Sequence, residues 1–234
     1  MTGDFFLTYD YLQTIGMNEN SLRDFALEFP YGGKYQDILD VYAGNKHTGL
    51  AAWLIELVGA TDDVLVYDKD INMSDRSIVF AGSIVFNSGV AIQDIIVGDN
   101  IRSEYYIRAS GDIEVGGDIE TKWYIQANGC LNAQGNIKVD GDIETGGDII
   151  AGGKIEAGGE IKSEESIRAG KDIESEIDTI KAGENIIAGG NIKAGGGCGI
   201  FAGLNVKIAE WPTKAKVIAK TKPDNLMTGY WVDK

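Results

Sequence analysis

The stretch "GDIETGGDIIAGGKIEAGGEIK", Gly141 to Lys162, repeats one unit of six residues with little chemical variety. Isoleucine occupies every sixth position, and a small or β-branched residue follows it two positions later, as Thr145 follows Ile143. Residues i and i+2 of a β-strand point the same way, so each unit offers one large and one small side chain to a common interior. Each unit is therefore predicted to form three residues of strand and three of corner, with glycine in many corners.

The same step of six continues far beyond this stretch, from Ile95 to Ile173, with Leu131 as the one replacement. A helix would turn each successive member by about 600° and scatter the series around its axis, so the period excludes a helix. Three sides of six residues close a triangular coil of about 18 residues, stacked about 4.8 Å apart. After Ile173 the next member is Ile180, and the extra residue in "SEIDT" predicts a bulge or a wider corner.

Two further patterns repeat after 18 residues. Aromatic pairs interrupt the glycine-rich corners and are expected to stack on one corner: Tyr105 and Tyr106, then Trp123 and Tyr124. Outward charges alternate in sign along one face at Arg102, Glu120, Lys138 and Glu156. Opposite charges one coil apart act as cross-strand pairs, each contributing about 0.2–1 kcal/mol.

The regions on either side of the repeats are expected to cap them. Residues 18–60 predict three short amphipathic helices: one after a capping box at Ser21 and Asp24, one from about Lys34 to Tyr42, and one over "GLAAWLIELVG" with Leu50, Trp53, Leu54 and Leu57 inward. "VLVYDKDI" predicts a strand, and "KAKVIAKTKPDNLMTGYWV" predicts two strands around Pro223-Asp224 that cover the last coil.

The predicted fold is mainly β: a parallel β-helix, or triangular β-solenoid, of about 18 residues per turn with a small α-helical N-terminal cap. The expected divisions are a helical cap over 1–77, a solenoid over 78–208 with about seven turns, and a C-terminal β cap over 209–234. Both ends of the solenoid are therefore expected to be capped, which disfavours endless filaments and permits a homodimer.

Charge restricts the partners of this chain. Its net charge is -15, and Asp and Glu outnumber Lys and Arg by 19 to 10 over residues 95–195, whereas residues 196–234 carry 3 acidic and 6 basic side chains. Nucleic acid and anionic membranes should be repelled, so a charged partner is expected to be a basic protein. The start lacks a basic, apolar leader and no later segment has about 18 uninterrupted apolar residues, which predicts a cytoplasmic protein.

The sequence contains only incomplete versions of the motifs that are typical of catalytic, metal and cofactor sites. "DKDINMSD" opens like an EF-hand loop, but Met73 stands where the loop needs glycine and Val79 where it needs glutamate. Cys130 and Cys198 share no motif with each other or with His47, the only histidine, so neither zinc nor a disulfide is expected. The glycine-rich run lacks the Gly-Lys-Ser/Thr of a phosphate loop. No catalytic residue, cofactor or metal is predicted.

The candidate partner-binding residues are of two kinds. The first is a set of carboxylates that recur with the repeat: Asp112, Glu114, Asp118, Glu120, Asp142 and Glu144. Carboxylate pairs can perform acid-base chemistry in a cleft, but a convex solenoid favours a solvated acidic face. The second is the aromatic set Tyr105, Tyr106, Trp123 and Tyr124, which is either a patch for a partner or packed beneath the helical cap.

The unit I-x-[AVST]-G-G-[DNEK] is similar in period to hexapeptide left-handed β-helices and in style to bactofilins, whose solenoids polymerise. It departs from hexapeptide acyltransferases, in which the small residue precedes the large one, and His47 lies outside the repeats. The order of "FPYGGKYQDIL", "AAWLIELVG", "AGGKIEAGGEI" and "KPDNLMTGYWV" resembles a group of uncharacterised phage- and prophage-encoded repeat proteins. That resemblance implies a phage context and no assigned catalytic residues.

The leading hypothesis is a non-enzymatic interaction protein, a phage-type anti-defence (anti-CRISPR-like) inhibitor that mimics DNA and occupies the nucleic-acid-binding surface of a basic defence protein. Residues 95–195 carry a net charge of -9 over roughly 27 Å, or one charge per ~3 Å against ~1.7 Å in duplex DNA, so the mimic is dilute. A self-assembling scaffold that joins through coil ends or the aromatic patch is the alternative. An enzyme on the repeats ranks third.

Overall fold

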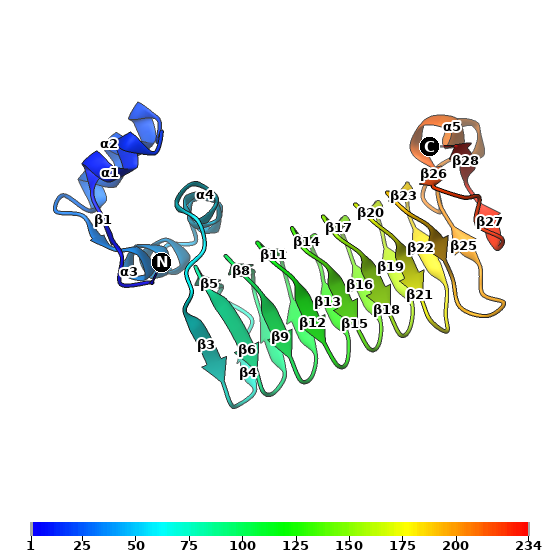
Figure 1. Cartoon of the computed structure of the whole chain (residues 1–234), viewed down its shortest axis with the longest axis horizontal. Helices are drawn as coiled ribbons and strands as arrows, with labels where there is room; N and C mark the ends of the chain where they lie inside the picture. Colours follow the sequence, from blue (N-terminus) through cyan, green and yellow to red (C-terminus); the bar gives the residue numbers. More distant parts are fainter. Residues whose placement is uncertain (1, 234) are drawn as a thin grey trace.

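Strands from Val64 to Asp233 stack along a common axis in three parallel sheets, in a computed structural model that describes residues 2–233. About nine coils, most of them of 18 residues, place eight short strands in one sheet and nine in each of the other two, and a group of helices stands at the N-terminal end (Figure 1). The prediction of a mainly β, parallel β-solenoid with an N-terminal helical unit is confirmed.

The three sheets are called I, II and III in the order in which the chain first enters them. Sheet I consists of β3 (Val64–Tyr67), β6 (Ser83–Phe86), β9 (Ile101–Ser103), β12 (Ile119–Thr121), β15 (Ile137–Val139), β18 (Ile155–Ala157), β21 (Ile173–Ser175) and β24 (Ile192–Lys193). Sheet II consists of β4 (Ile71–Met73), β7 (Val90–Ile92), β10 (Ile107–Ala109), β13 (Ile125–Ala127), β16 (Ile143–Thr145), β19 (Ile161–Ser163), β22 (Ile180–Ala182), β25 (Ile200–Phe201) and β27 (Leu226–Thr228). Sheet III consists of β5 (Ile78–Phe80), β8 (Ile95–Val97), β11 (Ile113–Val115), β14 (Leu131–Ala133), β17 (Ile149–Ala151), β20 (Ile167–Ala169), β23 (Ile186–Ala188), β26 (Lys216–Ala219) and β28 (Tyr230–Asp233).

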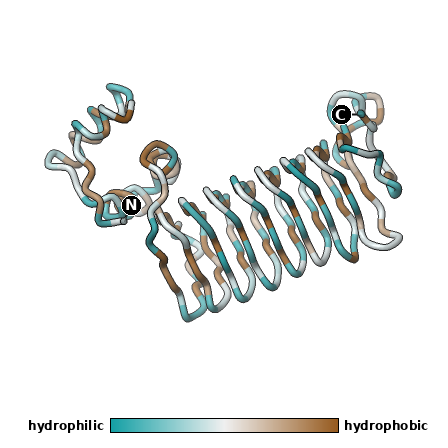
Figure 2. Tube along the Cα trace, viewed as in Figure 1, coloured by the Kyte–Doolittle hydropathy of each residue, from teal (hydrophilic) through white to brown (hydrophobic). Residues whose placement is uncertain are grey.

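The interior of the rod is made by the first and third residues of each repeat strand. Ile125 lies beside Ile107 and Ile143 in exact steps of 18, and all three are buried, whereas the middle residue of each strand points outward. Hydrophobic bands therefore alternate with hydrophilic ones along every coil (Figure 2). Burial of each isoleucine contributes about 1.5–3 kcal/mol, so the column of isoleucines is the main source of stability.

Hydroxyls that point into this interior find backbone acceptors. Ser163 Oγ donates to the carbonyl oxygen of Gly147 at 2.8 Å, and Ser175 Oγ donates to that of Gly159 at 2.7 Å. A buried hydroxyl without a partner would destabilise the fold, so these bonds explain why serine and threonine are tolerated at the small inward position.

The predicted wider corner after Ile173 is present. Ile180 pairs with Ile161 at a separation of 19 residues instead of 18. The extra length leaves Ile177 outside the core, with 74% of its surface exposed, while Ser175 Oγ accepts the backbone N–H of Asp178 at 3.1 Å. The insertion is absorbed in one corner, and the strands that follow keep their register.

The solenoid extends beyond its predicted limits at both ends. Its first coil begins at β3 and β4, before the expected start at Ile78, and the expected seven turns become about nine. At the C-terminus three strands form instead of two, and β26 and β28 continue sheet III in parallel. These end strands lack the isoleucine-glycine period, so counting the period could not find them.

Four helices and a small two-stranded sheet form the helical head, residues 2–59. The helices are α1 (Tyr9–Thr14), α2 (Glu19–Glu28), α3 (Tyr35–Gly44) and α4 (Thr48–Val58), and β1 (Phe6–Leu7) pairs antiparallel with β2 (Gly33–Lys34). The capping box predicted at Ser21 is wrong: Asn18 is the N-cap of α2, and its Oδ1 accepts the Ser21 N–H at 3.0 Å. Helix α1 was not predicted, because it is only six residues long.

The head packs on the outward face of sheet III. Its core includes Val79, Ala81 and Ile96 from the first coils, and α3 and α4 both contact β5. In α4 the buried residues are Ala51, Leu54 and Ile55, whereas Leu50, predicted to point inward, is 45% exposed. The helix is rotated relative to the prediction because it packs on a sheet as well as on α3.

The segment between β25 and β26 contains a 3-10 turn, η1 (Ile208–Glu210), and the short helix α5 (Trp211–Lys214). Gly203 N–H donates to the Glu184 carbonyl oxygen at 2.8 Å, which holds the start of this segment against the last coils. Trp211 Nε1 donates to the Val206 carbonyl oxygen at 3.2 Å within the segment. Helices α4 and α5 lie at opposite ends of the rod, both on the side of sheet III (Figure 1).

Candidate functional site

Four aromatic side chains form a two-layer stack on the corner between sheets I and II. The ring centroids of Tyr105 and Trp123 are 5.5 Å apart, and those of Tyr106 and Tyr124 are 5.6 Å apart at 13°. The predicted stacking of the two pairs is confirmed. The Arg108 guanidinium lies 5.7 Å from the Tyr124 ring centroid, a cation-π geometry. These four residues are called the aromatic corner.

The strand register creates the aromatic corner and the neighbouring coils limit it to two layers. Ile119 pairs with Ile101 on one side and Ile125 pairs with Ile107 on the other, so the corner residues between them overlie one another. In the coil before, the corner residue under the Tyr106 ring is Gly89, where any side chain would occupy the position of the ring.

The aromatic corner is open to solvent and not covered by the head. Trp123 is 53% exposed and Tyr105 is 43% exposed, while Tyr106 and Tyr124 are half-buried. Within residues 2–233 the core shared by the head and the solenoid draws only on strands and turns of sheet III, on the side of the triangle opposite this corner. Of the two predicted roles, packing beneath the helical cap is therefore wrong.

The six carboxylates predicted for the acidic face do not come together. Asp112, Asp118 and Asp142 occupy the three different corners of the triangle. Glu114, Glu120 and Glu144 lie at the centres of strands in the three different sheets, in β11, β12 and β16. Asp112 lies near enough to Glu114 to raise its pKa, but of the six only Glu114 lines the groove beside α4, so the set does not form an acid-base pair in that cleft.

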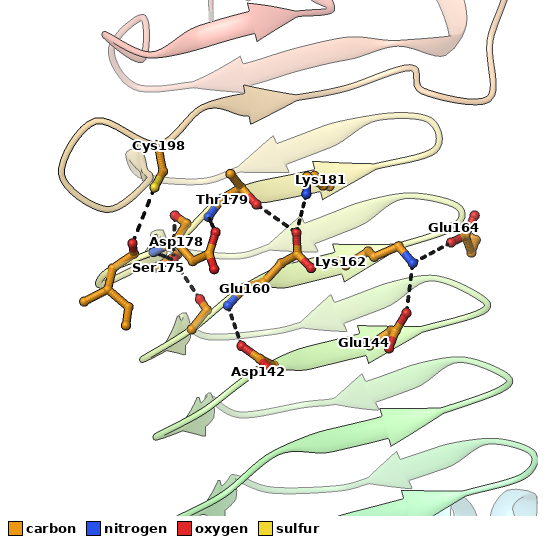
Figure 3. Close-up of polar contacts among 12 residues, drawn as sticks. Asp142, Glu144, Glu160, Lys162, Glu164, Ser175, Asp178, Thr179, Lys181 and Cys198 are labelled. Carbon is orange, nitrogen blue, oxygen red and sulfur yellow. Dashed lines mark hydrogen bonds and ion pairs between the residues drawn. The ribbon is translucent and has the colours of Figure 1, made fainter.

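The three aspartates also have a structural role that sequence reasoning missed. The Oδ1 atoms of Asp112, Asp118 and Asp142 accept the backbone N–H groups of Cys130, Asn136 and Glu160 in the next coil at 2.7, 2.6 and 2.8 Å. Figure 3 shows the bond from Glu160 to Asp142. We call this arrangement the Asx bracket, since asparagine forms it too, as from Lys154 N–H to Asn136 Oδ1 at 2.9 Å.

The Asx bracket explains the Gly-Gly-Asp unit. A side chain at Gly135 would collide with Asp118 Oδ1, and one at Gly159 would collide with Asp142 Oδ1. The glycine leaves space for the bracket from the previous coil, and the aspartate or asparagine that follows begins the bracket to the next coil. The signal for this role is a recurring Asp or Asn directly before the inward isoleucine.

The excess negative charge of the rod lies at the corners. Over residues 95–195 the strand centres carry seven Lys or Arg and five Glu, whereas the corners carry fourteen Asp or Glu and three Lys. The corners between sheets I and II and between sheets II and III each have a net charge of -5, and the third corner only -1. These two corners, called the acidic ridges, run along the rod on either side of sheet II.

Between the acidic ridges, lysines of sheet II pair with their neighbours. Lys162 Nζ lies 2.8 Å from Glu144 and 3.1 Å from Glu164, and Lys181 Nζ lies 2.6 Å from Glu160 (Figure 3). Hydrogen bonds to these carboxylates, first of all to Glu144, raise the pKa of Lys162. The pairs fix the lysines, so unpaired acidic side chains on the ridges dominate the outward field.

On sheet I the predicted alternation of charges has the expected register: Glu120 stands between Arg102 and Lys138, and Lys138 beside Glu156. The closest ion pair of Arg102, however, is to Glu104 in the adjoining corner, at 3.5 Å. Exposed pairs of this kind contribute little to stability.

The segment that begins like an EF-hand loop forms the corner between β3 and β4 and then strand β4 of the first coil. Asp68 Oδ1 accepts from Asn87 Nδ2 at 2.8 Å, and Asp70 accepts from Ser88 Oγ and from the Gly89 N–H. The hydrogen bond from Ser88 is the main cause that lowers the pKa of Asp70. Within residues 2–233 no three His, Cys, Asp or Glu side chains converge to hold a metal ion.

These features define the class of protein: a parallel β-solenoid that carries a helical head on sheet III and an exposed aromatic corner on an acidic ridge. No family model, curated protein or solved structure matches the chain, so its likeness to phage-encoded repeat proteins, bactofilins and hexapeptide β-helices stays a sequence-based expectation. Among the described helices none is long and apolar enough to cross a membrane.

Proposed function

We propose that this chain is a non-enzymatic interaction protein whose aromatic corner and acidic ridges bind a basic protein. The observation that carries the proposal is the Tyr105–Trp123 stack, about half exposed and set within an acidic ridge. Exposed tyrosine and tryptophan are the residue types that most often anchor protein interfaces. Beside the stack Glu104 is paired with Lys122 and Arg102. Carboxylates further along the same ridge, such as Asp140 and Glu176, select a lysine- or arginine-rich surface and accelerate encounter with it.

The narrower proposal is that the partner's basic surface is one that binds nucleic acid, as for a phage-type anti-defence inhibitor. Two parallel acidic ridges support it, because duplex DNA also presents two rows of negative charge. A net charge of -5 on each ridge over about 5.6 coils places one charge every ~5 Å, against ~3.4 Å along each strand of DNA. The ridges match the sign of the phosphate rows at lower density.

A competition experiment tests both levels of the proposal. Purified defence nucleases, each bound to a fluorescent DNA duplex, are titrated with the chain at low and high salt. Wild type is expected to displace the duplex from at least one nuclease, less so at high salt. The Tyr105→Ser/Trp123→Ser variant should compete at least about tenfold more weakly, because it lacks both exposed anchors.

The matched control is Tyr31→Ser, which removes a tyrosine that is 90% exposed on the head. If wild type displaces no duplex, the DNA-mimicking form of the proposal is wrong. If the chain competes but the corner variant competes as well as wild type, the aromatic corner is not the binding surface.

The alternative function is a self-assembling scaffold, and one observation favours it. The head covers only sheet III, so β3 and β4 remain edge strands, with Val64 59% and Val66 49% exposed. The expectation that both ends are capped is therefore incomplete at the N-terminal end. Exposed edges can pair with further strands. Electron microscopy should then show chains of rods that Val64→Lys/Val66→Lys abolishes; single rods of wild type would exclude the scaffold.

A further inference from the structure

A groove of about 930 Å³ lies between α4 and the outward face of sheet III. Trp53 and Glu56 of α4 form one wall. Glu114, Asn132 and Ile150 form the floor, at the centres of the successive strands β11, β14 and β17. The groove lies on the opposite side of the triangular rod from the aromatic corner.

The polar groups of this groove lack a cationic donor. Asn132 Oδ1 is buried and makes no hydrogen bond within residues 2–233. Burial raises the pKa of Glu114, and the nearby carboxylates of Asp112 and Asp94 raise it further. The lining contains two glutamates and neither lysine nor arginine. The complementary ligand is therefore a lysine or arginine side chain beside an apolar residue that covers Ile150, which is 36% exposed.

Such a segment exists in the same chain. Residues 204–222 contain five lysines and one glutamate, in a protein of net charge -15. At its start Lys207 is exposed, and Ile208 on η1 is 75% exposed. The one glutamate, Glu210, pairs with Lys214 at 2.8 Å, and among the described residues no carboxylate pairs with Lys207.

The position of this segment determines how the groove can be filled. The groove spans β8 to β17, near the N-terminal end of sheet III, whereas η1 and α5 stand beside β26 near its C-terminal end, on the same side of the rod (Figure 1). A segment fixed to β26 cannot reach the groove of its own chain. A two-fold axis perpendicular to the rod places each segment over the groove of a second copy, so one contact is made twice.

We propose that two copies associate antiparallel through sheet III, with Lys207 and Ile208 of each copy bound in the α4–sheet III groove of the other. The Lys207 ammonium donates to the Glu114 carboxylate, and Ile208 packs on Ile150. Between the two contacts the half-buried Ile187 and Ile218 extend the apolar face. The pairing leaves the aromatic corner free, so it is independent of the proposed function.

Sedimentation velocity of the full chain over a concentration series tests the pairing. Wild type is expected to form a dimer at about 0.01 M salt and to dissociate more readily at about 1 M salt, where charges are screened beyond ~3 Å. Glu114→Lys and Lys207→Glu each place like charges at both contacts, so each should weaken association at least about tenfold.

Mixing the two variants gives the decisive result. In a mixed pair the Lys at position 114 of one copy faces the Glu at position 207 of the other, and the second contact is wild type, so association should return. Glu120→Lys and Lys138→Glu, charge reversals on sheet I, are matched controls that should leave it unchanged, and circular dichroism checks the fold of every variant.

Three results would overturn the pairing. The first is a wild-type chain that remains monomeric at low salt at every concentration. The second is a dimer that neither charge reversal weakens. The third is a mixture of the two variants that associates no better than each variant alone. Ile208→Ser adds an uncharged comparison and should also weaken the dimer, because it removes the apolar anchor.

Discussion

Asp118 Oδ1 accepts the backbone N–H of Asn136, eighteen residues further on, at 2.6 Å, and Asn136 Oδ1 accepts the N–H of Lys154 at 2.9 Å. This row of Asx brackets on the corner between sheets III and I joins successive coils outside the strands. Backbone bonds already join this corner from coil to coil, as from Gly135 N–H to the Gly117 carbonyl oxygen at 2.9 Å, and the bracket satisfies the one remaining corner N–H, so it adds directly to coil stacking.

Removing one bracket should destabilise the solenoid. Asp118→Ala leaves the Asn136 N–H without its acceptor and is expected to lower the free energy of unfolding by about 1–3 kcal/mol, measured by urea denaturation. Asp118→Asn keeps an acceptor at the same position and should lower the free energy of unfolding much less. The control is Asp140→Ala, which changes an exposed corner aspartate that makes no such bond to the next coil. If Asp140→Ala lowered the free energy of unfolding as much as Asp118→Ala, the lost charge and not the lost bracket would be the cause.

The glycine that lies against each bracket should also be required for stability. A methyl group at Gly135 collides with Asp118 Oδ1 and approaches the Gly117 backbone at 2.9 Å, so Gly135→Ala should cost about 1–3 kcal/mol of stability. Gly196→Ala places its methyl group in open space and should be close to neutral. Similar thermal midpoints for the two variants would contradict a steric role for Gly135.

Substitutions at the aromatic corner should have little effect on the stability of the fold, even where they weaken binding. Trp123→Ala removes a side chain that is 53% exposed and is expected to cost about 0.5–1.5 kcal/mol, the range of an aromatic pair. Two positions later, Ile125→Ala empties a site that is 1% exposed and should cost about 2–5 kcal/mol. Denaturation of the two variants side by side checks this; a larger loss for Trp123→Ala would make the corner a structural element.

The groove glutamate should destabilise the monomer at neutral pH. Burial raises the pKa of Glu114 above the ordinary 4.5, so the folded chain binds its proton more tightly than the unfolded chain. Stability is therefore lost as pH rises from about 4.5 through the raised pKa. Glu114→Gln should be more stable than wild type above that range and show no gain below it, in urea titrations at about 1 M salt, where the proposed dimer is weakened. A gain that is constant with pH would contradict this origin.

The regular part of the fold could be predicted because six-residue periodicity is a local property. The inward isoleucines, the coil of 18 residues, the extra residue before Ile180 and the stacking of Tyr105 on Trp123 all follow from counting positions. The end coils could not be predicted in this way. Their strands, such as β3 and β28, belong to the sheets through pairing with the repeat and carry no period of their own.

The candidate site was predictable in part, for a related reason. Exposed aromatics are visible in a sequence, but an aspartate that accepts a backbone bond looks the same as one that faces solvent, so the role of Asp118 was missed. The groove exists because α4 packs beside sheet III, and this contact joins residues far apart in the sequence, which a local pattern does not reveal. One signal did exist: Val79, Ile96 and Ile150 are apolar at strand centres, where most strands of the repeat have polar side chains.

Every Asx bracket runs in the same direction, from a side chain to the backbone of the following coil. A completed coil therefore presents a ready set of acceptors to the part of the chain that is made next, about 18 residues later. Contacts at such short and constant sequence separation favour fast, stepwise folding. The rod can thus lengthen coil by coil in the order in which a ribosome delivers it.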